Sequence, residues 1–247
     1  MLAEGSGPPV LLLHGSGPGT TAAAWAPLIA ALAPHHRVIA PDLLGFGSSP
    51  KPEPGRSLRS AWTEQVLELV DSLSIESFAV VGNSAGGAIA LSLACARPGT
   101  VTRVVAVGSM GVAMPLPAGL DALWNAESAQ AVANLITFLA PSDASVVARE
   151  AAMRAQPWYS ELFPAPRQRW VDDLALTREE LAGIAAPVLL VHGAQDRIVP
   201  MRDSFLSLIE ALPDVRGHVF GRCGHASPLE HTDEFNRLLT TFLETDR

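Results

Sequence analysis

The sequence predicts an α/β fold: a doubly wound, mostly parallel sheet with an inserted helical cap. Short apolar runs rich in β-branched residues recur along the chain and lack in–out alternation, as strands covered on both faces do. Helical patterns separate most of these runs, which is typical of βαβ units. A long helical stretch in the second half contains no convincing strand.

The predicted elements follow one another in a strand–helix rhythm. The strands are Val10–Leu13, Val38–Ala40, Phe78–Val81, Val104–Val107, Val188–Val191 and Arg216–Phe220. The helices outside the long helical stretch are Trp25–Leu32, Leu58–Ser72, Ala85–Ala96, Met201–Ala211 and Asp233–Glu244.

The helical stretch predicts a cap over residues 115–186. It is punctuated by prolines, and it is much longer than an ordinary crossover connection, which argues against a run of plain surface helices. We therefore expect residues 1–114 and 187–247 to form the core domain.

Composition excludes several classes of partner. The 247-residue chain carries a net charge of −8, and no Lys/Arg cluster favours nucleic acid. We expect the two cysteines, Cys95 and Cys223, to be free, because no disulfide or metal-ligand spacing is present. Without a leader pattern or a long apolar run, we expect a soluble cytoplasmic protein that does not bind membranes.

The most specific motif is Gly82-Asn83-Ser84-Ala85-Gly86, between a predicted strand and a predicted helix. G-x-S-x-G in this context is the nucleophile elbow of the α/β-hydrolase fold. Its glycines let the strand and the helix pass closely while the serine occupies a sharp, strained turn. Ser84 is the predicted nucleophile.

A serine hydroxyl needs a base, and in this fold the acid and then the histidine follow the serine along the chain. His225 follows the last predicted strand in a glycine-flanked loop, and His231 is the alternative base. Asp196 follows the strand Val188–Val191, and Asp203 is the alternative acid, which we expect in the next helix.

An oxyanion hole needs backbone N–H donors. We expect one from Ala85, directly after the nucleophile, and one from the loop His14-Gly15-Ser16-Gly17-Pro18-Gly19. That loop matches neither a P-loop nor the G-x-G-x-x-G fingerprint, so it does not predict a nucleotide site.

These motifs and the segments 40–49, 163–168 and 219–225 occur in order over nearly the whole chain. In this order of motifs the sequence resembles the meta-cleavage product hydrolases, in particular those acting on 2-hydroxymuconate semialdehyde. The resemblance implies hydrolysis of a carbon–carbon bond in an anionic dienoate, without metal or organic cofactor. It implies that Ser16 and Ala85 bind the oxyanion. It also places Arg149 and Asn83 against the substrate oxygens, with Arg154 as the alternative arginine, and it leads us to expect a homodimer.

The sequence departs from the family pattern in three places. Ala226 stands where the family usually has Trp, and Ala85 where it often has Phe or Met, so a larger pocket or a change towards ester chemistry is expected. The family has antiparallel strands before the strand at Val10. None is predicted here, which would leave Val38–Ala40 as an unpaired edge.

Three functions remain open from the sequence: carbon–carbon bond hydrolysis, a carboxylesterase acting on small esters, and a noncatalytic receptor built on a hydrolase fold. The complete triad argues against the receptor, because a receptor needs neither the base nor the acid.

Overall fold

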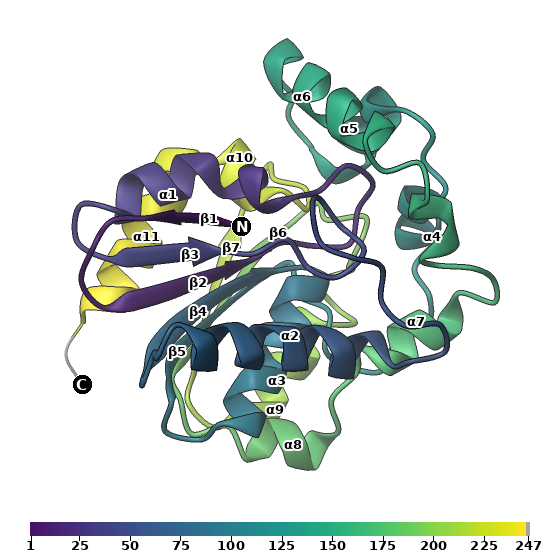
Figure 1. Ribbon diagram of the computed structural model, residues 1–247. Helices are drawn as coiled ribbons and strands as arrows, with labels where there is room; N and C mark the ends of the chain where they lie inside the picture. The colour runs from purple at the N-terminus through teal and green to yellow at the C-terminus, as the bar shows by residue number, and fades with distance from the viewer. Residues whose placement is uncertain (246–247) are drawn as a thin grey trace.

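In the computed structural model, which describes residues 1–245, seven strands form one sheet in the order β1-β3-β2-β4-β5-β6-β7 (Figure 1). The first pairing is antiparallel and all the others are parallel. The strands are β1 (Leu2–Glu4), β2 (Pro9–Leu13), β3 (Arg37–Ala40), β4 (Phe78–Asn83), β5 (Val101–Val107), β6 (Val188–Gly193) and β7 (Val215–Phe220).

Helices cover both faces of this sheet (Figure 1). One face carries α2 (Leu58–Ser72), α3 (Ala85–Ala96), α8 (Arg178–Ala182) and α9 (Phe205–Ala211); the other carries α1 (Ala26–Leu32) and α11 (Thr232–Glu244). Within β2, Leu11 and Leu13 pack in one apolar cluster and Val10 and Leu12 in the other. This burial on both faces explains why the strand shows no polar alternation.

Between β5 and β6 the described chain is helical. After α4 (Ala118–Trp124), α5 (Ala129–Ile136) and α6 (Asp143–Arg154) come a 3-10 helix (Tyr159–Glu161) and α7 (Gln168–Asp173). Figure 1 shows α4 to α7 outside the layers that cover the sheet, whereas α8 packs against α3 and α9. The predicted range 115–186 therefore includes one helix that belongs with the core layer. None of the described helices is long and apolar enough to cross a bilayer.

The start of the chain differs from the prediction. β1 pairs antiparallel with β3, Leu2 opposite Ala40 and Glu4 opposite Val38. The prediction that no strand precedes Val10, and that Val38–Ala40 is unpaired on that side, is therefore wrong. All three side chains of β1 are exposed, so the strand leaves no apolar pattern and depends on backbone pairing.

Several helices begin at other residues than the sequence predicts. The predicted helix Trp25–Leu32 divides into a 3-10 helix (Ala22–Trp25) and α1, and α9 begins at Phe205 rather than at Met201. A short helix, α10 (Ser227–Glu230), follows the histidine loop and was not predicted. These changes do not alter the order of the elements.

Candidate functional site

Ser84 occupies the sharp turn between β4 and α3. Its φ of 57° and ψ of −118° lie in a region that side-chain-bearing residues rarely adopt. A Cβ at Gly82 would lie 2.0 Å from the carbonyl oxygen of Gly86, and one at Gly86 would lie 2.3 Å from that of Leu13. The two glycines are thus required by close backbone approach, as the motif predicts.

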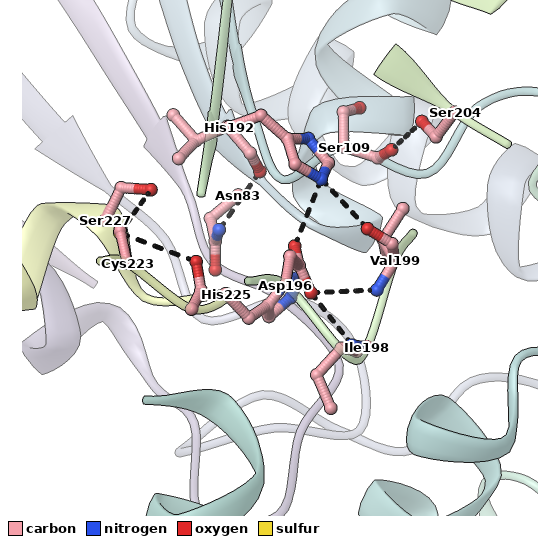
Figure 2. Close-up of polar contacts among 12 residues, drawn as sticks. Asn83, Ser109, His192, Asp196, Ile198, Val199, Ser204, Cys223, His225 and Ser227 are labelled. Atoms are coloured by element: carbon pink, nitrogen blue, oxygen red, sulfur yellow. Dashed lines mark hydrogen bonds and ion pairs between the residues drawn. The ribbon is translucent and has the colours of Figure 1, made fainter. Parts of the chain in front are cut away.

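His225 and Asp196 meet beside this turn. His225 lies in the loop after β7, and its Nδ1 is 2.7 Å from Oδ2 of Asp196 in the loop after β6 (Figure 2). The other carboxylate oxygen accepts from the amides of Ile198 at 2.8 Å and Val199 at 3.0 Å. The alternative acid, Asp203, lies in a turn before α9 rather than in the helix.

Electrostatics keep the carboxylate of Asp196 ionised. Burial alone raises its pKa, but the His225 imidazole, His192 and the backbone amide of Val199 outweigh burial and lower the pKa below the ordinary value. His192 lies 3.4 Å from Oδ2 of Asp196, and its Nε2 is 2.9 Å from the carbonyl oxygen of Val199 (Figure 2). Burial lowers the pKa of His192, so this second imidazole stays neutral.

The predicted site residues gather around one cavity of about 70 Å³. Ser84, His225, Ser16, Asn83 and Arg149 line it, and its apolar wall includes Leu123, Val132, Ile136, Ala226 and Leu229. Asp196 lies behind His225, with no exposed side-chain surface. Ala226 therefore borders the cavity, whereas Ala85 packs in the apolar core.

The glycine loop lies directly beside the nucleophile. A Cβ at Gly15 would be 3.1 Å from Cβ of Ser84. Two cap side chains hold Ser16: the Tyr159 hydroxyl donates to its carbonyl oxygen at 2.7 Å, and the Trp124 indole donates to its hydroxyl at 3.3 Å. The amide of Ala85 is the first of α3 and has no acceptor within the helix.

The imidazole of His14 connects the same loop to Leu43 through two hydrogen bonds. The amide of Leu43 donates to its Nε2 at 3.0 Å, so Nδ1 carries the proton and donates to the carbonyl oxygen of Gly15 at 2.8 Å. Burial lowers the pKa of His14, so the imidazole stays neutral in this tautomer. Sequence reasoning did not assign roles to His14 or Tyr159. The position of His14, directly before the glycine loop, was the available signal for it.

Arg149 reaches the cavity from α6. Its Nη1 donates to the carbonyl oxygen of Pro18 at 2.8 Å and to the hydroxyl of Thr20 at 3.2 Å. Burial lowers the pKa of the guanidinium, which nevertheless keeps its proton at neutral pH. The alternative, Arg154, has a side chain that is 79% exposed and pairs with Glu150. Asn83 donates through Nδ2 to the carbonyl oxygen of Val107 at 3.0 Å.

Neither the cysteines nor a metal cluster supplies another reactive group to this site. Both cysteines are free, and burial raises the pKa of the Cys223 thiol, near His225, to about 12. Within residues 1–245, no three His, Cys, Asp or Glu side chains are grouped as metal ligands.

Comparison with known proteins agrees with this geometry. A model of the alpha/beta hydrolase family matches residues 10–238. The chain is 41% identical to a 2-hydroxymuconate semialdehyde hydrolase of Pseudomonas sp. strain CF600, covering 97% of this chain and 88% of the relative. It is 38% identical to a 2-hydroxy-6-oxo-2,4-heptadienoate hydrolase of Pseudomonas putida, covering 98% and 91%.

Solved structures give the same result. The meta-cleavage product hydrolase from Pseudomonas fluorescens IP01, solved with acetates, superposes with a TM-score of 0.91 and 37% identity, covering 98% of this chain and 92% of that one. The 2-hydroxy-6-oxo-6-phenylhexa-2,4-dienoate hydrolase from a Rhodococcus strain superposes with a TM-score of 0.86 and 33% identity, covering 99% and 94%. The chain therefore belongs to the alpha/beta hydrolase family and, within it, to the meta-cleavage product hydrolases.

Proposed function

We propose that this protein hydrolyses a carbon–carbon bond in a meta-cleavage product of the 2-hydroxymuconate semialdehyde type. The observation that carries the proposal is the half-buried guanidinium of Arg149 in the same cavity as Ser84 and His225. No carboxylate of residues 1–245 forms an ion pair with it within 4.0 Å. A cation without an ionic partner at the wall of an apolar cavity favours an anionic ligand.

In this proposal Ser84, His225 and Asp196 form the catalytic triad. Asp196 holds Nδ1 of His225 protonated, so Nε2 is left to take a proton from the nucleophile. The amides of Ser16 and Ala85 bind the oxyanion, and the cap side chains Trp124 and Tyr159 hold the Ser16 loop in place.

Arg149 and Asn83 then bind the oxygens at the carboxylate end of the substrate. Two guanidinium nitrogens of Arg149, Nε and Nη2, are not used in its bonds to Pro18 and Thr20. They can therefore face a carboxylate in the bidentate geometry that guanidinium groups favour. This places the reactive carbonyl at the other end of the molecule, towards Ser84.

The reaction begins with ketonisation, in which the enol proton moves to the carbon beside the distal carbonyl. The oxygen of Ser84, or of a water molecule activated by His225, then bonds to that carbonyl carbon, and its proton passes to His225. The carbon–carbon bond breaks with its electron pair delocalised into the departing dienolate. After protonation, and hydrolysis of any acyl-enzyme, the products are 2-hydroxypenta-2,4-dienoate and a carboxylic acid, with one water consumed.

The test compares 2-hydroxymuconate semialdehyde and its methyl ketone analogue with p-nitrophenyl acetate. Rapid bleaching of the yellow dienolate beside slow ester turnover is the expected result. Replacing Ser84 with Ala should lower kcat roughly 10⁴–10⁶-fold on every substrate that is turned over. Ester turnover without bleaching would overturn the carbon–carbon activity, and substantial turnover by Ser84→Ala would overturn the triad.

A second candidate is a carboxylesterase acting on small esters. The small side chain of Ala226 at the cavity wall, beside His225, favours it, because the family's usual Trp would occupy that space. The same assay separates the two: the esterase turns over p-nitrophenyl acetate faster than either dienoate.

The cytoplasmic location and the homodimer remain proposals that follow from the family. Cell fractionation tests the first. Sedimentation of the purified chain tests the second, with a monomer at all concentrations as the contradicting result.

A further inference from the structure

The loop that carries His225 is bound to the cap through backbone contacts. The carbonyl oxygen of Ile136, at the end of α5, accepts from the amides of His225 at 2.7 Å and Ala226 at 3.1 Å. A Cβ at Gly224 would lie 2.6 Å from that carbonyl oxygen and 2.9 Å from the amide nitrogen of Phe138. The two backbones are thus in direct contact at the site.

The side chain of Glu230 bridges the same two segments. Its Oε1 accepts at 2.7 Å from the amide of Gly224, which directly precedes His225. Its Oε2 accepts from the amides of Phe138 and Leu139, each at 2.7 Å, in the turn after α5. One carboxylate therefore joins the histidine loop to the cap through three short, charge-assisted hydrogen bonds.

The bridged turn connects the two helices that form part of the cavity wall. Val132 and Ile136 come from α5 and Arg149 comes from α6, and all three line the cavity. The two helices pack against each other away from the sheet (Figure 1). A displacement of this helical pair from the loop would move the substrate-binding wall and remove the acceptor of the His225 amide together.

We propose that Glu230 is a positioning residue that locks the α5–α6 helical pair onto the catalytic histidine loop. Both of its carboxylate oxygens must accept, since the groups on both sides are N–H donors. A glutamine of the same shape has one accepting oxygen and one donating NH₂, so it can satisfy only one side. The proposal rests on the proposed function and assigns to Glu230 the task of keeping the substrate-binding wall and the catalytic histidine loop in their relative positions.

The test is Glu230→Gln, with Asp173→Asn as the matched control. Asp173, in α7, also joins the cap to the core through a carboxylate, which accepts from the amides of Leu58 at 2.7 Å and Arg59 at 3.2 Å. It does not contact the histidine loop. A role limited to general stability would therefore make the two variants alike.

For each variant we would measure amide hydrogen exchange over residues 136–141, the rate at which a fluorophosphonate labels Ser84, and kcat and KM on the dienoate. We expect Glu230→Gln to exchange faster in that segment, to label Ser84 at least tenfold more slowly and to show a raised KM, at a Tm close to that of Asp173→Asn. Asp173→Asn should keep wild-type exchange and labelling. Unchanged labelling and exchange in Glu230→Gln, or equal losses in both variants, would overturn the proposal.

Leu139→Pro is the second variant if Glu230→Gln does not fold. Proline has no N–H, so this change removes one donor on the cap side and leaves the carboxylate and the histidine loop intact. It should reproduce the faster exchange and the slower labelling, and wild-type values would contradict the lock. Fluorophosphonate labelling does not depend on the natural substrate, so failure of the dienoate assay alone rejects only the proposed function.

Discussion

The short hydrogen bond between Asp196 and His225 determines what the imidazole can do. An ionised carboxylate at Nδ1 keeps the proton there and leaves Nε2 as the base. Two backbone amides hold the other oxygen of Asp196, so the carboxylate cannot rotate away. The orientation of the carboxylate and the tautomer of the imidazole are thus set by this hydrogen bond and by the two backbone amides.

Replacing Asp196 with Asn should lower kcat roughly 10⁴-fold, because the amide stabilises the wrong tautomer of His225. Steady-state kinetics on p-nitrophenyl acetate and on the dienoate would check this. Asp203→Asn, in the turn before α9, is the control and should retain wild-type kcat. A loss smaller than tenfold in Asp196→Asn would show that another acid serves His225.

The arginine in the cavity should distinguish substrates by charge. Hydrogen bonds to charged groups contribute about 1.5–3 kcal/mol. Arg149→Gln should therefore lower kcat/KM for the dienoate roughly 10–100-fold, mainly through KM. Turnover of uncharged p-nitrophenyl acetate should change little. Arg154→Gln, at an exposed position on the same helix, is the control. Equal effects of the two substitutions would contradict the role of Arg149.

At the scale of elements, the turn between β4 and α3 depends on close contact between backbones. The carbonyl oxygens of Gly86 and Leu13 occupy the places where side chains at Gly82 and Gly86 would lie. The strained conformation of Ser84, which costs of order 1–3 kcal/mol, is maintained by backbone hydrogen bonds. The N–H of Ser84 donates to the carbonyl oxygen of Val107 at 2.8 Å, and its carbonyl oxygen accepts from the amide of Met110 at 3.1 Å. The nucleophile is therefore held by the end of β5 and the segment that follows it, as well as by its own turn, in which the amide of Gly87 donates to the Ser84 carbonyl oxygen at 3.0 Å.

Gly82→Ala should destabilise the protein by about 3 kcal/mol or more, since backbone must move to admit one methyl group. Thermal or denaturant unfolding would measure the loss. Gly221→Ala is the matched control, because a Cβ there would meet nothing within 4 Å. If Gly82→Ala unfolds at the same denaturant concentration as Gly221→Ala, the close contact does not constrain the turn.

At the scale of the whole molecule, buried neutral histidines link stability to pH. Burial lowers the pKa of both His14 and His192 in the folded protein. Between this lowered pKa and the ordinary value of about 6.5, the unfolded chain binds more protons than the folded one. Stability is therefore fully present above the ordinary pKa and falls as pH falls through this window. The lowered pKa of Asp196 has the same sign, but its contribution is lost only at more acidic pH.

The free energy of unfolding should accordingly fall as the pH is lowered from about 7 to 5. His192→Gln should show a shallower slope over this range, whatever its stability at pH 7, because one linked proton is removed. Denaturant titrations at several pH values measure the slope. His35→Gln, at an exposed position, should keep the wild-type slope. An unchanged slope in His192→Gln would contradict the linkage.

The sequence by itself determined the parts that depend on local pattern. Six of the seven strands and the nucleophile elbow were predictable. Five of these strands, β2 to β6, are mainly buried, and both this burial and the need for glycine are recorded in consecutive residues; β7 is mostly exposed or half-buried. The assignment of Ser84, Asp196 and His225 followed from the serine–acid–histidine order of the α/β-hydrolase fold, together with the position of each residue directly after a predicted strand.

Only the tertiary structure decided the contacts between distant segments. β1 pairs through its backbone and shows no apolar pattern, α8 joins the core layer by packing, and Tyr159 holds Ser16 across 143 positions of chain. The bridge made by Glu230 is of the same kind. Its carboxylate joins two segments only because the fold brings backbone N–H groups from both of them to it. Such contacts leave no periodicity in the sequence, because their partners are set by the packing of the cap against the sheet and not by neighbours along the chain.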